Sequence, residues 1–239
     1  MTELLYQTDS YTKEFDARVV SILPAERAVI LDRSAFYPGG GGQPCDFGTL
    51  TVEGVAYPVD KAKKQGDDVL HFLGGDVPLT VEASAAHGTL DWARRYELMR
   101  THTALHILCG TVFRDYGALV TGGEMEPGKG RLDFEFETMR GELVREIETA
   151  INKEAAQGRE IRVQILPREE AFQIPDLIRT KINLLPAGIT HVRTVEIVGL
   201  DLQADGGTHV RNTNEVGTIR VADYKSKGAI NKRIYIEIE

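Results

Sequence analysis

The chain has 239 residues, enough for one large domain or two modest ones with a buried hydrophobic core. Its 28 Lys and Arg residues against 36 Asp and Glu residues give a net charge of -8, which disfavours broad, nonspecific binding to a polyanion such as duplex nucleic acid. Two cysteines are too few for a disulfide framework, the N-terminal segment lacks the basic and apolar regions of a secretory signal, and no stretch approaches the roughly 20 apolar residues that span a bilayer. We therefore expect a soluble, cytoplasmic protein with no membrane partner.

The first 90 residues predict a β-rich domain. Short apolar segments separated by Gly, Pro and Asp follow one another at spacings typical of a small all-β barrel or sandwich. Because no helical periodicity interrupts them, we predict a β-barrel-like N-terminal domain over residues 1–90. The strands are expected at residues 18–23, 27–31, 48–52, 55–59, 68–73 and 79–83.

The hydrophobic period changes at Asp91, and residues 91–239 predict an α+β domain. A long helix is expected from Asp91 to Gly117, because apolar residues recur there at helical spacing. A second helix is expected over residues 140–157, with Thr138 as its N-cap. Its apolar face is expected to hold Leu143, Ile147, Ala150 and Ile151, and the remaining elements are strands at 131–137, 161–166, 191–197, 217–224 and 232–239 with a short helix after Pro167.

Two histidines on the long helix predict half of a metal site. His102 and His106 in RTHTALH are four residues apart, which puts both imidazoles on one helix face about one turn apart, as two ligands of a single metal require. Thr103 stands where the metallopeptidase motif HExxH has its glutamate, so a peptidase is not expected. Two unrelated polar residues at the edge of the core would give the same spacing.

A second pair, Asp205 and His209 in ADGGTH, predicts the other half of the site. Gly206 and Gly207 allow backbone angles that a Cβ would obstruct, so the chain could turn both side chains towards one point. Two separate pairs of N or O ligands are a common way to build a zinc site. We therefore expect one metal ion bound by His102, His106, Asp205 and His209.

The segment FYPGGGGQPCDFG contains four consecutive glycines, Gly39, Gly40, Gly41 and Gly42. It lacks the Gly-Lys-Ser/Thr and Gly-x-Gly-x-x-Gly patterns, so a nucleoside triphosphate loop is not expected. A tight connection between strands needs only one or two glycines. Four in a row indicate either mobility or a close approach of the backbone to another surface, such as the second domain or a ligand.

Five segments carry a resemblance over almost the whole chain: FYPGGGGQP, RTHTALHIL, RLDFEFE, DLQADGGTHV with the following VGTIRV, and KSKGAINKRI. In this order they resemble the free-standing alanyl-tRNA editing proteins, which are similar to the editing domain of alanyl-tRNA synthetase. The resemblance implies a β-barrel-like domain that carries the glycine-rich loop, followed by an α+β, metal-dependent editing domain. It also implies a zinc-dependent hydrolase that removes wrongly attached serine, and in some members glycine, from the tRNA for alanine.

Residue by residue, His102 and His106 match the family's HxxxH pair, and His209 matches the final histidine of its Cys-Gly-Gly-Thr-His segment. Asp205 departs from the family pattern, because it stands where the family has the cysteine. Carboxylate and thiolate are both anionic and zinc accepts oxygen ligands, but the harder oxygen also suits manganese or iron. Two roles remain open for Asp205: a direct metal ligand, which we expect, or a base that orients or deprotonates water beside a tri-histidine site.

The implied reaction is hydrolysis of the ester between an amino acid and the terminal ribose of tRNA. A metal ion can activate water and polarise the ester carbonyl, so no serine or cysteine nucleophile is needed. To spare alanine and cleave serine, the enzyme needs groups that hydrogen-bond the serine hydroxyl. Four polar residues near the ligands and the glycine run fit this role, although each also fits a cap or turn: Thr101, Thr103, Thr208 and Gln43.

Basic residues cluster locally despite the acidic total. We expect them to contact phosphates near the acceptor end of the tRNA for alanine, with a modest affinity that falls steeply with salt, although a solvated face is the alternative. One expected patch comprises Lys225, Lys227, Lys232 and Arg233, and a second comprises Arg94 and Arg95.

Two other functions fit the same sequence. One is a noncatalytic tRNA- or partner-binding module, in which a structural metal fixes the fold and Asp205 closes the fourth coordination position. The other is a general small-ester hydrolase, which would cleave esters that lack tRNA. The sequence carries no signal for an oligomeric state.

Overall fold

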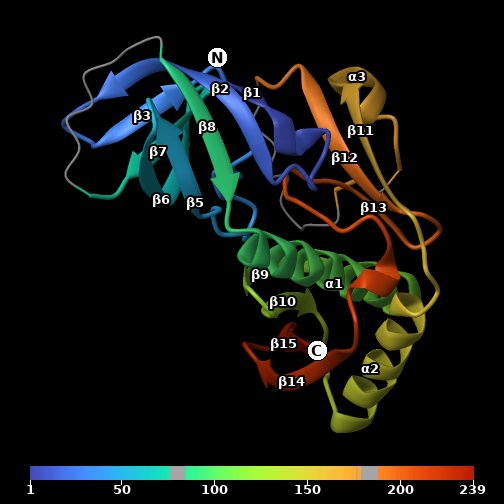
Figure 1. The fold of residues 1–239 in the computed structure, drawn as a ribbon. Coiled ribbons are helices and arrows are strands. Elements are labelled where there is room, and N and C mark those ends of the chain that lie inside the picture. The colour runs from blue at the N-terminus through green and yellow to red at the C-terminus, as the bar shows by residue number, and fades with distance from the viewer. Residues whose placement is uncertain (76–83, 176, 179–187) are drawn as a thin grey trace. The chain divides into compact units, whose positions relative to one another are not determined.

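A computed structural model describes residues 1–75, 84–175, 177–178 and 188–239 (Figure 1). The chain divides into two compact units, Met1–Tyr96 and Glu97–Glu239. That residues 1–90 and 91–239 are separate functional domains stays a prediction. Among the helices that the structure describes, none is long and apolar enough to cross a membrane.

The first unit is built on a closed barrel of antiparallel strands, in the order β2-β3-β7-β6-β5-β8. Alternate side chains along the strands are buried, so that apolar residues fill the barrel, and the predicted barrel-like fold is confirmed. The strands are β2 (Glu14–Leu23), β3 (Ala28–Leu31), β5 (Gly48–Val52), β6 (Val55–Gln65), β7 (Asp68–Leu73) and β8 (Ala85–Leu90), and a short parallel pair, β1 (Glu3–Leu4) with β4 (Arg33–Ser34), lies beside η1 (Leu5–Gln7).

Five of the predicted N-terminal strands occur in the barrel, and the sixth, at residues 79–83, lies outside the described residues. Strand β8 was not predicted, because its sequence AAHGTL contains few β-branched or aromatic residues. Its Gly88 is required by packing: a Cβ at this position would lie 2.4 Å from the ring of Phe15. Part of the weak strand signal therefore results from a close contact between the paired neighbouring strands β8 and β2.

The glycine run of the first unit forms a tight turn in which all four residues have positive φ. The angles are 83° at Gly39, 134° at Gly40, 57° at Gly41 and 90° at Gly42, a region that L side chains rarely adopt. Gly40 and Gln43 close the turn by exchanging backbone hydrogen bonds of 3.0 and 2.9 Å. The positive φ angles alone therefore explain why all four residues are glycine.

In the second unit, helix α1 (Trp92–Tyr116) lies, from Glu97 onward, between two antiparallel sheets (Figure 1). A Cβ on Gly130 of β10 would lie 3.0 Å from Leu105, and a Cβ on Gly110 would lie 2.8 Å from the Cβ of Asp201 at the start of β13. One sheet has the order β14-β15-β10-β9 and the other β11-β12-β13. Their strands are β9 (Val120–Glu126), β10 (Lys129–Glu135), β11 (Ile161–Pro167), β12 (His191–Ile197), β13 (Asp201–Ala204), β14 (Ile219–Ser226) and β15 (Asn231–Ile238), with short helices α3 (Arg168–Ala171) and η2 (Thr213–Glu215).

Helix α2 (Gly141–Ala155) packs along β14 and differs from the predicted second helix in two details. Its N-cap is Arg140, which makes no side-chain capping bond, so Thr138 lies before the helix and does not cap it. Its buried apolar face includes Val144, whereas Leu143 and Ala150 are only partly buried. The mixed arrangement of sheets and helices confirms the predicted α+β class.

Candidate metal site and its neighbours

Four side chains of the second unit converge on one point, and we call them the ligand cluster: His102 and His106 from α1, and Asp205 and His209 from the segment after β13. One potential ligand atom from each lies within 4.8 Å of those from the other three. The three imidazole centroids are 4.2, 4.6 and 5.0 Å apart. The histidines are 3 to 6% exposed, so the cluster lies at the edge of the core. The structure therefore brings together the predicted ligand residues in an arrangement that can hold a metal ion.

The turn that carries Asp205 is held by its own carboxylate, which accepts a 2.8 Å hydrogen bond from the backbone N–H of Gly207. This contact two residues ahead is the geometry of an Asx turn. Neither Gly206 nor Gly207 has a positive φ, and a Cβ on Gly206 would meet no atom within 4 Å. The prediction that these glycines are needed for unusual backbone angles is therefore wrong, because the side chain of Asp205 forms the turn.

Distances within the ligand cluster fit a small cation. Asp205 Oδ2 lies 3.1 Å from His209 Nε2, and Asp205 Oδ1 lies 3.6 Å from His102 Nε2. A tetrahedral zinc ion with bonds of about 2.0 to 2.2 Å would separate neighbouring ligand atoms by about 3.4 Å. The donor set of three imidazoles and one carboxylate thus suits zinc, and its oxygen also suits manganese or iron.

Two contacts outside the ligand cluster orient its imidazoles. Nδ1 of His106 lies 3.1 Å from Oδ2 of Asp201, and Nδ1 of His209 lies 3.1 Å from Oγ1 of Thr103. Each contact leaves Nε2 as the ring nitrogen that can bind a metal. Thr103 Oγ1 also accepts a 3.3 Å hydrogen bond from the N–H of Val210, which fixes the chain just after His209.

A buried arginine, Arg193, adds a positive charge next to the ligand cluster. The side chain of Arg193 on β12 is 5% exposed, and its Nη1 donates a 3.0 Å hydrogen bond to the backbone carbonyl of Asp205 and lies 3.7 Å from that residue's carboxylate. With Asp201 and Asp205 the site holds two carboxylates against one guanidinium. Because charge is costly to bury unless it is compensated, the second carboxylate favours a further positive charge in the site, either a proton on His106 or a bound cation.

Burial controls the protonation of the ligand cluster. It lowers the pKa of His102 well below 6.5 and that of His209 to about 4, although Asp205 opposes both shifts. Burial also acts to lower the pKa of His106, but the hydrogen bond and charge of Asp201 outweigh it and raise the pKa. Burial acts to raise the pKa of Asp205, yet its interactions with His102 and His209 hold that pKa well below 3.8. The lowered pKa values favour neutral His102 and His209 and an ionised Asp205, the forms that bind a metal, whereas the raised pKa of His106 favours its protonated form until a metal displaces the proton.

The predicted substrate-binding residues are all buried. Thr101 has no exposed surface, donates its hydroxyl to the carbonyl of Glu97 and accepts a hydrogen bond from the N–H of Gly128. The prediction that Thr101 binds substrate is therefore wrong, because its hydroxyl links α1 to the turn between β9 and β10. Thr103 contacts His209, and substrate contacts of Thr103, Thr208 and Gln43 stay predictions.

Arg95 belongs to the interior of the first unit. It is fully buried, its Nε lies 2.9 and 3.0 Å from the carboxylate oxygens of Asp46, and its other nitrogens donate to the carbonyls of Ser10 and Ala35. The prediction that Arg95 contacts tRNA phosphates is therefore wrong. The half-buried Arg94 lies with its guanidinium 3.9 Å above the ring of Phe47, and its phosphate contact stays a prediction.

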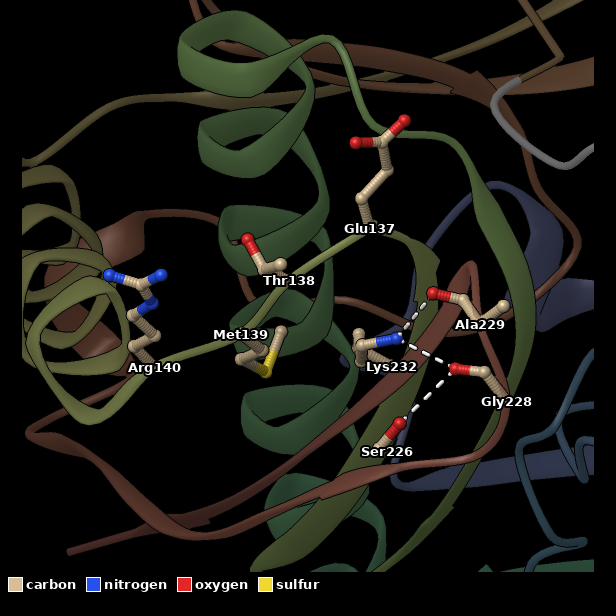
Figure 2. Close-up of a pocket in the computed structure, with 8 residues that line it drawn as sticks. All are labelled: Glu137, Thr138, Met139, Arg140, Ser226, Gly228, Ala229 and Lys232. Carbon is tan, nitrogen blue, oxygen red and sulfur yellow. Dashed lines mark hydrogen bonds between the residues drawn. The ribbon is translucent and has the colours of Figure 1, made fainter.

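The basic residues near the C-terminus differ in their accessibility. Lys232 is 5% exposed, and Figure 2 shows its ammonium group bonded to the carbonyls of Gly228 and Ala229, at 2.7 and 2.8 Å. Its predicted phosphate contact stays a prediction. Lys225 and Lys227 are exposed, and Arg233 pairs with Asp133. The open pocket beside Lys232 has a volume of about 550 Å³ and is lined by Glu137, Thr138, Met139, Arg140, Ser226, Gly228, Ala229 and Lys232.

Three residues near the ligand cluster were not identified from the sequence: Arg193, Asp201 and Gln203. Pairing of β12 with β13 places Val195 opposite Gln203 and Ile197 opposite Asp201, so all three lie on one face of this sheet. The alternation of side chains along each strand would have placed Arg193, Asp201 and Gln203 on one face of the sheet. The sequence offered no signal that this face meets α1.

Two family models match the chain: the threonyl and alanyl tRNA synthetase second additional domain over residues 192–235, and tRNA synthetases class II (A) over residues 8–94. The alanyl-tRNA editing protein AlaX-M of Saccharolobus solfataricus is 42% identical over 243 residues, which cover 100% of both chains. AlaX-M of Methanosarcina acetivorans is 35% identical over 244 residues, which cover 100% of this chain and 99% of that protein. The alanine–tRNA ligase of Ignicoccus hospitalis is 38% identical over 226 residues, which cover 92% of this chain and 24% of the ligase. With full-length identity at this level, the chain belongs to the family of alanyl-tRNA editing proteins.

Proposed function

We propose that this chain is a metal-dependent deacylase that removes wrongly attached serine from the tRNA for alanine. Glycine on the same tRNA is the second candidate substrate. Relatives that match over their full length are named for alanyl-tRNA editing. The observation that carries the proposal is the convergence of the ligand cluster within 4.8 Å, from two segments far apart in the chain.

We propose His102, His106, His209 and Asp205 as the ligands of one zinc ion, with manganese or iron as alternatives for the oxygen donor. When bound, such an ion supplies Lewis-acid chemistry that polarises an ester carbonyl and makes water more acidic. The reaction adds water to the ester: the bond between the carbonyl carbon and the ribose oxygen breaks, and that oxygen takes a proton.

The chain's own groups have distinct roles in this proposal. Asp201 holds His106, and Thr103 holds His209, so that the ligand nitrogens keep their direction. Arg193 places a buried positive charge beside Asp205, which favours the negative charge that develops on the ester oxygen during attack. None of these roles needs a nucleophilic side chain.

Selectivity must distinguish serine from alanine, which lacks one hydroxyl. A site that hydrogen-bonds the hydroxyl can reject the analogue without it by a factor on the order of 10⁴, because its own polar groups would be left unpaired. We propose Thr208, which lies between Asp205 and His209 in sequence, as the first residue to test for this contact, with Gln43 and Thr103 as further candidates. For phosphate contacts near the acceptor end we propose Lys225, Lys227, Arg233 and Arg94.

The test combines zinc analysis with a deacylation assay on the tRNA for alanine charged with serine, glycine or alanine. We expect the wild type to bind one zinc ion per chain and to release serine but not alanine. His106→Ala and Asp205→Ala should lose deacylation by at least about 100-fold, more than the loss of an outer contact would cause. His191→Ala, at an exposed histidine on β12, is the matched control and should keep full activity.

Other results of the deacylation assay would contradict the proposed function in different ways. Retained activity in His106→Ala and Asp205→Ala would remove the mechanism, and loss in His106→Ala alone would remove Asp205 as an essential ligand. Binding of tRNA and zinc without release of an amino acid would indicate the noncatalytic module, a function that the nearly complete burial of the histidines also fits. Cleavage of small esters that lack tRNA would indicate a general esterase.

A further inference from the structure

Asp201 lies outside the ligand cluster but contacts one of its histidines. Its Oδ2 is 3.1 Å from His106 Nδ1 and accepts a 2.7 Å hydrogen bond from Nε2 of Gln203. We propose that Asp201 is a positioning residue that fixes His106 for metal binding, and that Gln203 holds Asp201 in place. This inference rests on the proposed function, because it assumes that His106 is a metal ligand.

The burial of Asp201 points to a specific role. Its side chain has no exposed surface, and an ionised carboxylate is costly to bury unless hydrogen bonds compensate it. The two hydrogen bonds of Oδ2 provide part of that compensation, and both come from residues beside the ligand cluster. A residue that served only to fill space here would be apolar, because replacing a buried charge by an apolar group of similar shape is often neutral or stabilising.

The packing of α1 is built to allow this contact. Gly110 lies one turn after His106, and a Cβ at Gly110 would lie 2.8 Å from the Cβ of Asp201 and 3.0 Å from the carbonyl oxygen of Leu200. Any larger residue would push the start of β13 away from the helix. Gln203 adds a further link to α1, because its Nε2 lies 3.3 Å from Sγ of Cys109.

The spacing of Asp201 and Gln203 along β13 places both side chains next to α1. Asp201 and Gln203 are two residues apart on one strand, so their side chains lie on the same face, towards α1. A carboxylate that accepts the Nδ1 proton of a histidine fixes the tautomer with its lone pair on Nε2 and restricts rotation of the ring. Asp201 thus selects which nitrogen of His106 faces the ligand cluster.

The test measures metal binding directly. The Zn²⁺ dissociation constant is determined by competition with a chromogenic chelator, and the visible spectrum of the Co²⁺-loaded protein reports the coordination geometry. Asp201→Asn, which keeps the shape but removes the charge, should weaken Zn²⁺ binding about 10- to 100-fold and change the Co²⁺ spectrum. Gln203→Met should have a smaller effect in the same direction. Asp223→Asn, at an exposed aspartate of the same unit, is the matched control and should match the wild type.

Urea unfolding of the metal-free variants separates a folding defect from a binding defect. If Asp201→Asn folds and binds Zn²⁺ as tightly as the wild type, with the same Co²⁺ spectrum, the positioning role is wrong although the proposed function stands. If Asp201→Asn does not fold, Gln203→Met decides: unchanged Zn²⁺ affinity overturns the proposal. A wild type that neither binds Zn²⁺ nor releases serine would instead overturn the proposed function.

Discussion

Both units bury histidines, but they use the ring nitrogens differently. In the barrel, Nε2 of His71 lies 2.7 Å from the hydroxyl of Ser34 and Nδ1 lies 3.3 Å from the carbonyl of Val29, so neutral partners occupy both nitrogens. In the ligand cluster, outer contacts occupy Nδ1 of His106 and His209, while three rings and a carboxylate converge. Burial alone therefore does not indicate a metal site; convergence of ligand atoms does.

The comparison implies that the buried polar side chains inside the barrel unit, such as His71 and Arg95, serve stability and not metal binding. Arg95→Met tests this most strongly, because it leaves the carboxylate of Asp46 buried without its partner. Breaking a buried pair in this way costs about 3–5 kcal/mol. We expect that loss in the urea unfolding free energy of the full chain, with an unchanged Zn²⁺ dissociation constant.

A matched variant on the same helix is Arg94→Met, which removes a half-buried arginine of the same shape. It should destabilise the protein far less than Arg95→Met. Equal losses from the two substitutions, or weaker Zn²⁺ binding in Arg95→Met, would contradict the separation of roles between the two units.

His71 makes the stability of the barrel unit depend on pH. Burial lowers its pKa from 6.5 to about 4. Between these values the unfolded chain binds more protons at His71 than the folded chain, so stability is fully present above pH 6.5 and falls as the pH drops towards 4. The shift corresponds to about 3 kcal/mol of stability.

His71→Gln keeps groups that can bond to Ser34 and Val29 but does not ionise. Because His102 and His209 also have lowered pKa values, the measurement is the difference in unfolding free energy between metal-free wild type and variant from pH 7 to pH 4. We expect the variant to lose less stability on acidification, by up to the full contribution of His71. Parallel pH profiles would show that His71 does not titrate on unfolding.

The hydroxyl of Thr103 serves both the fold and the ligand cluster. Thr103→Val keeps the shape but leaves the N–H of Val210 and Nδ1 of His209 without this acceptor. We expect a loss of about 1–2 kcal/mol in the unfolding free energy and weaker Zn²⁺ binding. Thr103→Ser, which keeps the hydroxyl, should recover both; if it does not, the methyl packing of Thr103 is what matters.

Local patterns made much of the fold and the ligand cluster predictable. His102 and His106 share a helix face by spacing alone, and Asp205 and His209 lie within one short turn. Short apolar segments separated by Gly, Pro and Asp likewise indicated most strands of the barrel. The four-ligand requirement of zinc joined the two pairs as a hypothesis, and the resemblance to the editing proteins supported it, because no spacing rule connects segments so far apart in the chain.

Contacts that depend on tertiary packing were missed. Asp201 stands only four residues before Asp205, yet its contact with His106 exists only because β13 meets α1 at Gly110. Arg95 was misassigned for the opposite reason: it was grouped with its neighbour Arg94 as a basic patch. Helical spacing places Arg95 in line with the buried Leu98 and Met99, and that signal indicates an interior position.

The pairing of β12 with β13 has a consequence for how this family can evolve. Side chains alternate between the two faces of a strand, so adding or deleting a single residue between Leu200 and Asp205 would turn Asp201 and Gln203 away from the helix. By contrast, the turn at Glu53 and Gly54 of the barrel has open space around its glycine. The turn at Gly54 therefore has room for an inserted residue, whereas β13 accepts substitutions but not a change of length by one residue.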